Sequence, residues 1–276
     1  MSVYIATGFT GTTYPLSHGR VCWNAYSGTV TATTEAAGFA ASNAATVRTD
    51  SAWRPTAATG TWTLTFGSAQ PVSFIGIAKH DLGTQNATIA IEYDAAGGSE
   101  VWAAFAGLGA VQPADDAPLL FLVPATSSDA VRVRITAADA APTISVVRVG
   151  EADEWPRPFV WTGQPITEGD RISFDNTMSL TGNWLGRSIA SDGLSFDLQM
   201  NNAPESWRRG DFAAFKAYAN GEDAAFFIAA RPTADYLAEV AYAWAADIVT
   251  ASRETPNKAV STSVTLSCQA LRPANG

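Results

Sequence analysis

The chain has 276 residues, of which 47% are hydrophobic, 11% aromatic and only 16% charged, so it can fill a sizeable core and cannot be largely disordered. Its 17 basic and 26 acidic residues give a net charge of −9. Because binding to a phosphate backbone depends on Lys and Arg contacts, this balance excludes nucleic acid as an expected partner.

Residues 1–150 are rich in short segments typical of β-strands. Apolar and polar residues alternate in several of them, which indicates strands with one buried face. In residues 131–135, Arg132 and Arg134 alternate with aliphatic residues in this way. Short strands separated by turn residues predict a jelly-roll β-sandwich. The predicted strands are residues 61–66, 72–77, 87–93, 119–123, 130–135 and 143–149.

Residues 151–158 divide the chain, because they contain three carboxylates and two prolines. Proline removes a backbone donor and restricts the residue before it, so this composition predicts the end of a strand. We place a domain boundary here, between an N-terminal jelly roll at residues 1–150 and a second β-rich domain at residues 151–276. The predicted fold class is mainly β, with one short helix in the second domain.

The short helix is predicted at residues 205–219, where Trp, Phe and Tyr recur at mainly helical spacing. Gly210 lies inside it, at a cost of about 1 kcal/mol relative to alanine. Residues 236–247 fit a helix by their alanines and a strand by the alternation of their larger residues, and we favour the strand. The other predicted strands are residues 170–174, 194–200 and 259–268.

Motifs for catalysis or metal binding are sparse. The 2 His, His18 and His80, show no HExxH spacing and no third ligand, so we interpret them as hydrogen-bonded loop residues. Asp115 and Asp116 lack EF-hand spacing, which favours a solvated acidic turn over a calcium site. Residues 182–186 contain glycines but not the Lys-Ser/Thr of a phosphate loop. We expect no enzyme activity, no metal and no cofactor.

The sequence also shows no pattern typical of a signal peptide or a transmembrane helix. The first residues, MSVYIATGFTG, have neither a basic start nor a long apolar run, so no signal peptide is predicted. No segment approaches the roughly 20 uncharged apolar residues of a transmembrane helix. The 2 Cys, Cys22 and Cys268, are expected to be small buried hydrophobes.

The 9 Trp residues carry more information, because many of them lie in turn-rich segments. A loop tryptophan either closes the end of a β-sandwich or stacks on a ligand or partner. For any single tryptophan we favour the role of closing the sandwich. The number of such tryptophans, taken together, favours a recognition surface. The tryptophans in turn-rich segments are Trp23, Trp53, Trp102, Trp155, Trp161 and Trp184.

Motifs at residues 51–83 occur in a familiar order: SAWRPT, then TWTL, then IGIA before a His-Asp-Leu-Gly turn. This order resembles discoidin-like, galactose-binding-like jelly rolls, and the resemblance covers about residues 20–150. Such domains commonly bind glycans or partners through loops at one end of the sandwich. The resemblance implies Trp53, Arg54 and His80 as the nearest ligand-binding candidates, although a fold does not by itself establish sugar binding.

A second set of motifs begins with PRPF at residues 156–159 and continues with LGRSI at residues 185–189 and FFIA at residues 226–229. This order is similar to that of tailed-bacteriophage virion proteins found among tail and baseplate components. The resemblance covers about residues 155–270. It implies a location in the virion after synthesis in the bacterial host cytoplasm, and other tail or baseplate proteins as partners.

Three functional classes follow from these observations. The first is a non-enzymatic structural component of a phage tail tip or baseplate, assembled as a symmetric homo-oligomer without membrane insertion. The alternative is a carbohydrate- or receptor-binding module that attaches the virion to a host-surface glycan. The third class, a hydrolase of cell-surface polysaccharide, needs two carboxylates roughly 5–9.5 Å apart, which the sequence does not identify.

Overall fold

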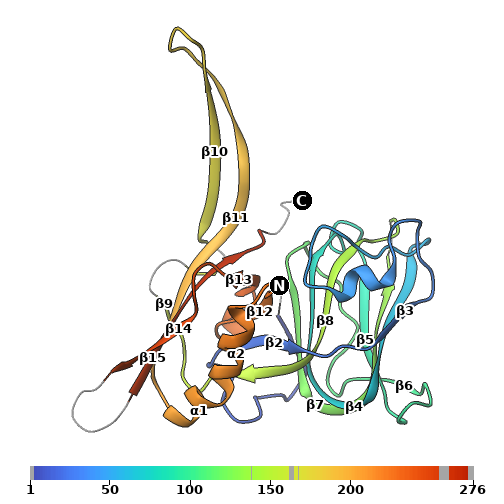
Figure 1. Cartoon of the computed structure of the whole chain (residues 1–276). Coiled ribbons are helices and arrows are strands. Elements are labelled where there is room, and N and C mark those ends of the chain that lie inside the picture. The colour runs from blue at the N-terminus through green and yellow to red at the C-terminus, as the bar shows by residue number, and fades with distance from the viewer. Residues whose placement is uncertain (1–2, 138, 162–164, 167, 255–260, 273–276) are drawn as a thin grey trace.

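Strands dominate the backbone of the computed structural model, which confirms the predicted mainly β fold class (Figure 1). The structure describes residues 3–137, 139–161, 165–166, 168–254 and 261–272. The earlier strands are β1 (Val3–Ile5), β2 (Arg20–Ala25), β3 (Thr29–Ala32), β4 (Thr59–His80), β5 (Thr88–Asp94), β6 (Trp102–Ala104), β7 (Leu119–Thr136) and β8 (Ile144–Glu154). The later strands are β9 (Val160–Trp161), β10 (Asp170–Met178), β11 (Trp184–Ala203), β12 (Phe226–Ala229), β13 (Val240–Ala245), β14 (Thr250–Glu254) and β15 (Ser261–Ala270).

The helical segments are short. They are the α-helices α1 (Glu205–Arg209) and α2 (Asp211–Ala219) and the 3-10 turns η1 (Ala41–Ala45) and η2 (Ala234–Tyr236). None of the helices in the described ranges combines the length and the apolar character that crossing a bilayer requires.

The long strands β4 and β7 organise the N-terminal part, and each of them unites two strands that the sequence predicts separately. They pair with each other over most of their length, with a register shift between Thr65 and Gln70 that lets the ladder bend. Before the bend β4 pairs with β3, whereas after it β4 pairs with β8. Side chains from both halves pack into one core, which is consistent with the predicted jelly-roll sandwich.

The predicted alternation in β7 is confirmed. Val131 and Val133 are buried, whereas Arg132 and Arg134 lie on the opposite face and pair with Glu92 of β5 at 2.6 and 3.3 Å. Each fully buried aliphatic side chain of this kind contributes about 1.5–3 kcal/mol. The pattern therefore fixes which face of the strand meets the core.

β2 joins the N-terminal and C-terminal parts of the chain. One edge of β2 pairs with β8, where Arg20 lies opposite Glu154, and the other edge pairs with β12, where Cys22 lies opposite Phe227. Residues 151–154, for which composition predicts a strand end, are instead the last residues of β8. Hydrogen-bonded strands thus run without interruption across the predicted boundary, and the division into domains 1–150 and 151–276 stays a prediction.

A cluster of buried apolar residues belongs to both parts of the chain. It contains Phe74 and Leu120 from the N-terminal strands together with Phe227 and Tyr242 from β12 and β13. Gly76 of β4 lies directly against the Phe227 ring, because a Cβ atom on this glycine would lie 2.4 Å from Cε2 of Phe227. A side chain at position 76 would therefore push the two parts apart.

The C-terminal part differs from the prediction at its helix. The expected helix at residues 205–219 is two helices, because Gly210 has φ −97° and ψ −97° and breaks the backbone between α1 and α2. The strand favoured for residues 236–247 is confirmed as the shorter β13, and the predicted final strand as β15. Trp155 packs against the rings of Trp207 and Phe215 beneath these helices.

β10 and the first part of β11 form a hairpin that projects away from the rest of the chain (Figure 1). We call residues 170–193 the arm. The sequence predicts strands only at residues 170–174 and 194–200, whereas the ladder continues almost to the turn, where Met178 lies opposite Trp184. The prediction missed the arm because the turn residues 179–183 interrupt the alternation that identifies strands.

Gly76→Ala should destabilise the protein by about 1–3 kcal/mol, because the new methyl group meets the buried Phe227 ring. Gly67→Ala in the same strand is the matched control, since nothing lies within 4 Å of its new Cβ atom, and it should be nearly neutral. Urea unfolding followed by tryptophan fluorescence measures both free energies of unfolding. Equal stability of the two variants would contradict the close approach of Phe227 to β4.

Candidate functional site

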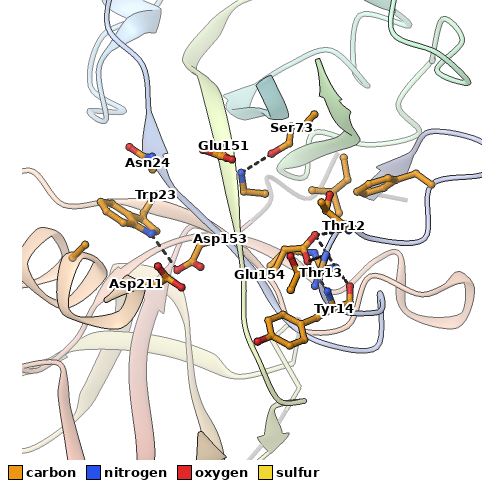
Figure 2. Close-up of a pocket in the computed structure, with 16 residues that line it drawn as sticks. Thr12, Thr13, Tyr14, Trp23, Asn24, Ser73, Glu151, Asp153, Glu154 and Asp211 are labelled. Atoms are coloured by element: carbon orange, nitrogen blue, oxygen red, sulfur yellow. Dashed lines mark hydrogen bonds and ion pairs between the residues drawn. The ribbon is translucent and has the colours of Figure 1, made fainter. Parts of the chain in front are cut away.

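A cleft of about 520 Å³ opens where β2 and β8 meet α2 and a loop around residues 9–14 (Figure 2). Its lining includes the carboxylates of Glu151, Asp153 and Glu154 from β8 and of Asp211 from α2. Among the described residues that line it, Arg20 is the only cation. The cleft, which we call the acidic cleft, therefore presents an excess of negative charge and hydrogen-bond acceptors.

Glu154 holds the loop that forms one wall of the acidic cleft. Its carboxylate accepts hydrogen bonds from the backbone N–H groups of Thr12, Thr13 and Tyr14 at 2.9, 2.7 and 2.7 Å (Figure 2). Burial acts to raise the pKa of Glu154, but these donors and the guanidinium of Arg20 outweigh burial and keep the pKa below its usual value. The Glu154 carboxylate is thus ionised, and its hydrogen bonds and its ion pair are made within the chain, to backbone N–H groups and to Arg20.

Arg20 completes the same wall from beneath, and its side chain is 1% exposed. Its guanidinium lies 3.4 Å from Glu154 and donates to the carbonyls of Tyr14 at 2.6 Å and His18 at 3.1 Å. A buried cation is costly unless it is paired and hydrogen-bonded, so this network fixes the path of the loop before β2.

Asp153 lies on the other side of the acidic cleft, next to Trp23 and Asp211 (Figure 2). The Trp23 indole donates from Nε1 to Oδ2 of Asp153 at 3.4 Å. Burial raises the pKa of Asp153 to about 7; the Trp23 hydrogen bond opposes this rise, and the charges of Asp211 and Glu154 add to it. Asp153 therefore changes its charge near neutral pH, which an ordinary aspartate does not do.

The acidic cleft suits a ligand that supplies hydrogen-bond donors and a flat apolar face. Asp211 and Glu151 are exposed, and neither has an ion-pair partner among the described residues. The Trp23 ring is partly exposed and rests on Phe215 and Tyr218 of α2. Sequence reasoning missed this site, because its acidic residues come from β8 and α2. These two elements meet at β2, which pairs with β8 and packs Trp23 against α2.

Trp53 and His80, two of the three predicted ligand-binding residues, lie on either side of Ile144. The Trp53 backbone exchanges hydrogen bonds with Ile144 at 2.8 and 2.9 Å, and His80 lies opposite Ile144 in the ladder of β4 and β8. The Trp53 ring is 0% exposed, and its Nε1 donates to the Thr34 carbonyl at 3.1 Å. Its indole therefore closes the end of the sandwich core and is not accessible to a ligand in this structure.

His80 is a buried, hydrogen-bonded residue. The Leu82 N–H donates to Nδ1 at 3.2 Å, which assigns the proton to Nε2, and Nε2 donates to the Ala117 carbonyl at 2.9 Å. Burial lowers the pKa of His80 to about 4, so the ring is neutral at physiological pH. One side of it lines a second cleft of about 250 Å³ together with Lys79 and Arg272.

Arg54, the third predicted residue, is partly exposed, and its guanidinium lies 4.4 Å above the Phe39 ring. Trp53 and Arg54 are neighbours on one loop, and His80 ends the adjacent strand, so the structure brings the three to the same end of the sandwich. Ligand binding by Arg54 and His80 stays a prediction.

The acidic turn differs from its prediction at Asp116, whereas Asp115 is exposed as expected. Asp116 is only 9% exposed, and its carboxylate accepts hydrogen bonds from the Thr84 N–H at 3.0 Å and the Thr84 hydroxyl at 2.6 Å. It therefore organises the turn after β4 rather than facing water. Within the described ranges, no group of three or more His, Cys, Asp or Glu side chains could hold a metal ion.

The cysteine prediction is confirmed, since Cys22 and Cys268 are both free and buried, and burial raises the pKa of both thiols. The tryptophans fall into buried and exposed residues, the two roles that the sequence analysis considered. Trp155 is buried, whereas Trp184 on the arm is 66% exposed. The side chain of Trp161 lies outside the described residues.

No family model matches the sequence, and no curated protein matches it either. Several solved structures are similar to parts of the chain. Chitosan-binding module 1 from a chitosanase/glucanase of Paenibacillus sp. IK-5 shares 18% identity over 46% of this chain and 97% of its own, with a TM-score of 0.40. A pectin-binding carbohydrate-binding module shares 16% identity over 46% of this chain and 93% of its own, also at 0.40.

The family 32 carbohydrate-binding module of C. perfringens NanJ, in complex with galactose, shares 15% identity. It covers 44% of this chain and 91% of its own, with a TM-score of 0.38.

Asp153→Asn should remove a pH dependence of stability. Because the pKa of Asp153 is raised in the folded state, its contribution to stability is complete below about pH 4 and is lost as the pH rises through 7. The wild type should therefore lose up to about 1.4 kcal/mol per pH unit across this window relative to Asp153→Asn. Urea unfolding at intervals from pH 4.5 to 8 measures the slope.

The matched control for this measurement is Asp175→Asn, which removes an exposed carboxylate from the arm and should leave the wild-type slope unchanged. If the free energy of unfolding changed with pH in the same way for the wild type and Asp153→Asn, the pKa of Asp153 would not be raised in the folded state, which would contradict the prediction.

Proposed function

We propose that this chain is a non-enzymatic structural subunit that assembles as a symmetric oligomer, within the tail tip or baseplate of a tailed bacteriophage. The observation that carries assembly is the arm, which concentrates the large exposed apolar side chains of the described residues. Those on the arm are Phe174, Met178, Leu180, Trp184, Leu185 and Ile189. Exposed apolar surface on this scale is typical of a protein interface.

The energetics of the arm support this proposal. A two-stranded hairpin is at best marginally stable alone in water, and the arm extends beyond the strands that would cover it (Figure 1). Apolar surface costs roughly 25 cal/mol per Å² when it stays in water. A neighbouring protein that covers the arm would recover this free energy and would stabilise the hairpin.

The phage setting comes from the motif order at residues 155–270. The LGRSI motif of that resemblance lies on the arm at residues 185–189, and the FFIA motif forms β12 in the shared core. The proposed partners are other tail or baseplate proteins and further copies of this chain. A charged fraction of only 16% fits a subunit that is packed among neighbours.

The second candidate function is binding of a host-surface carbohydrate or receptor, and a separate observation favours it. The partly exposed Trp23 ring and the exposed carboxylates of Asp211 and Glu151 line the same acidic cleft. Sugars present hydroxyl donors around a flat apolar face, which such acceptors and an aromatic ring can contact. This activity is compatible with an assembled subunit.

Phage particles that contain an epitope-tagged copy of this chain should carry the tag at the end of the tail, because the subunit is built into the structure there. Negative-stain imaging with a labelled antibody measures the position, and untagged particles are the control. Mature virions without the label would contradict the phage setting. Release of reducing sugar from host envelope by the purified chain would contradict the non-enzymatic assignment.

Trp23→Ala and Asp211→Asn should each weaken any glycan binding at least tenfold, because they remove the ring and an acceptor of the acidic cleft. A glycan array with the full chain identifies the ligand, and calorimetry compares the variants. Asp175→Asn on the arm is the control and should bind as the wild type does. An array that stays blank at high micromolar protein concentration would rule out this second function.

A further inference from the structure

The two faces of the arm differ in chemistry. Residues opposite one another in an antiparallel pair point to the same face, so Phe174 and Ile189 share a face, and so do Met178 and Trp184. Asn176 and Arg187 lie between these two pairs on that face, where the Arg187 guanidinium rests 4.0 Å from the Phe174 ring. We call this the apolar face of the arm. The opposite face carries Arg171, Ser173, Asp175, Thr177 and Ser188.

The turn of the arm is held in place by its own hydrogen bonds. The Ser179 N–H donates to the Asn183 carbonyl at 2.8 Å, and the Asn183 N–H donates to the Ser179 hydroxyl at 3.0 Å. The Gly182 N–H closes the loop onto the Ser179 carbonyl at 2.9 Å. Leu180 and Trp184 therefore project from an ordered turn, which lowers the entropy that a partner must remove on binding.

The difference between the faces indicates a protein partner. A segment inside a bilayer meets hydrocarbon on every side and must satisfy all of its backbone groups internally. The arm has a polar face with Asp175 and Arg171, and β10 ends the sheet with an unpaired edge. One apolar and one polar face instead fit a sheet that packs on another sheet and keeps its other side in water.

The exposed apolar area of the whole arm, its turn included, approaches that of one side of an interface between proteins. At roughly 200 Å² for a large aromatic side chain and no more for an aliphatic one, the six exposed side chains of the arm leave at most on the order of 800 Å² uncovered. The four that the register assigns to the apolar face, Phe174, Met178, Trp184 and Ile189, leave on the order of 450 Å² of this area. A standard specific interface buries about 800 Å² on each partner. The exposed fractions are 39% for Phe174, 58% for Met178, 109% for Leu180, 66% for Trp184, 64% for Leu185 and 60% for Ile189.

Charge indicates where copies of this chain can approach one another. With a net charge of −9, two copies repel over most of their surface. Residues 176–191 contain no carboxylate and one cation, Arg187, so this part of the arm is free of that repulsion. An apolar face of the same chemistry on each copy can form both sides of a two-fold contact, in which the same patch of the two copies meets.

We propose that the apolar faces of the arms from neighbouring copies of this chain pack on one another around the symmetry axis of the oligomer. This contact rests on the proposed assembly function and assigns its surface. The arms then supply the main contact between copies, with Trp184 and Ile189 at its centre and the face of Ser188 exposed to water.

Sedimentation velocity of the full chain from 1 to 100 µM tests this contact. The wild type should form a discrete oligomer, and the double variant Trp184→Ser/Ile189→Ser should raise its dissociation constant at least tenfold. Thr177→Ala/Ser188→Ala changes the polar face of the same arm and should leave the oligomer intact. Circular dichroism of each variant verifies that it is folded.

Cross-linking locates the contact independently of affinity. Ile189→Cys should be joined between copies by a short bismaleimide, whereas Ser188→Cys, its neighbour on the other face, should not. The native Cys22 and Cys268 are buried and do not compete. A wild type that is monomeric at every concentration, an oligomer that survives Trp184→Ser/Ile189→Ser, or equal cross-linking at both positions would overturn the proposal.

Two further outcomes separate this contact from other possibilities. Binding of the wild type to phosphatidylcholine vesicles, with loss of binding in Trp184→Ser/Ile189→Ser, would identify lipid as the occupant and overturn it. Arm-dependent oligomers in a chain that is absent from virions would end the phage setting and leave the contact standing. A chain that is monomeric in solution but present in virions would overturn the contact between arms and leave the phage setting standing.

Discussion

The pairing of β2 with both β8 and β12 is the constraint on which the rest of the structure depends. β2 comes from the start of the chain, whereas β8 crosses the predicted domain boundary and β12 lies beyond it. Backbone N–H and C=O groups that leave water must find partners, so a strand between two others is held on both edges. This arrangement lets the aromatic residues of β12 and β13 share a core with the N-terminal strands and makes Gly76 necessary beneath Phe227.

The same pairing creates the acidic cleft. Because Arg20 lies opposite Glu154 in the ladder, the end of β8 carries a satisfied buried ion pair on one side and Asp153 on the other. Alternation along the strand sends these two neighbouring carboxylates into different surroundings. Glu154 meets three N–H donors and a guanidinium, whereas Asp153 meets an indole and further carboxylates, so their pKa values move in opposite directions.

The arm has the opposite physical character from the junction. At the junction Arg20 and Glu154 are paired and the rings of Phe227 and Tyr242 are buried, whereas the arm leaves its apolar face uncovered in a single copy of the chain. Exposed apolar surface of this kind is typical of an interaction site, which agrees with the proposal that a second copy covers the arm. The described residues thus form a body with buried apolar cores and an arm whose large apolar side chains are exposed.

The sequence by itself determined the elements whose pattern is local. Alternation at residues 131–135 predicted a strand with the correct inward face, and composition predicted buried thiols at Cys22 and Cys268. Alternation also favoured a strand within residues 236–247, because larger residues recur there at every second position. These features depend on neighbouring residues, which a sequence displays directly.

Only the tertiary structure decided what distant segments do to one another. The strand partners of β2, the gathering of Asp153, Asp211 and Trp23, and the burial of Trp53 all arise from contacts between residues far apart in the chain. Gly210 was expected to weaken one helix but breaks it in two, because the rings on both sides must reach the Trp155 cluster. Local pattern cannot specify such contacts, since each depends on where the rest of the chain has placed its backbone.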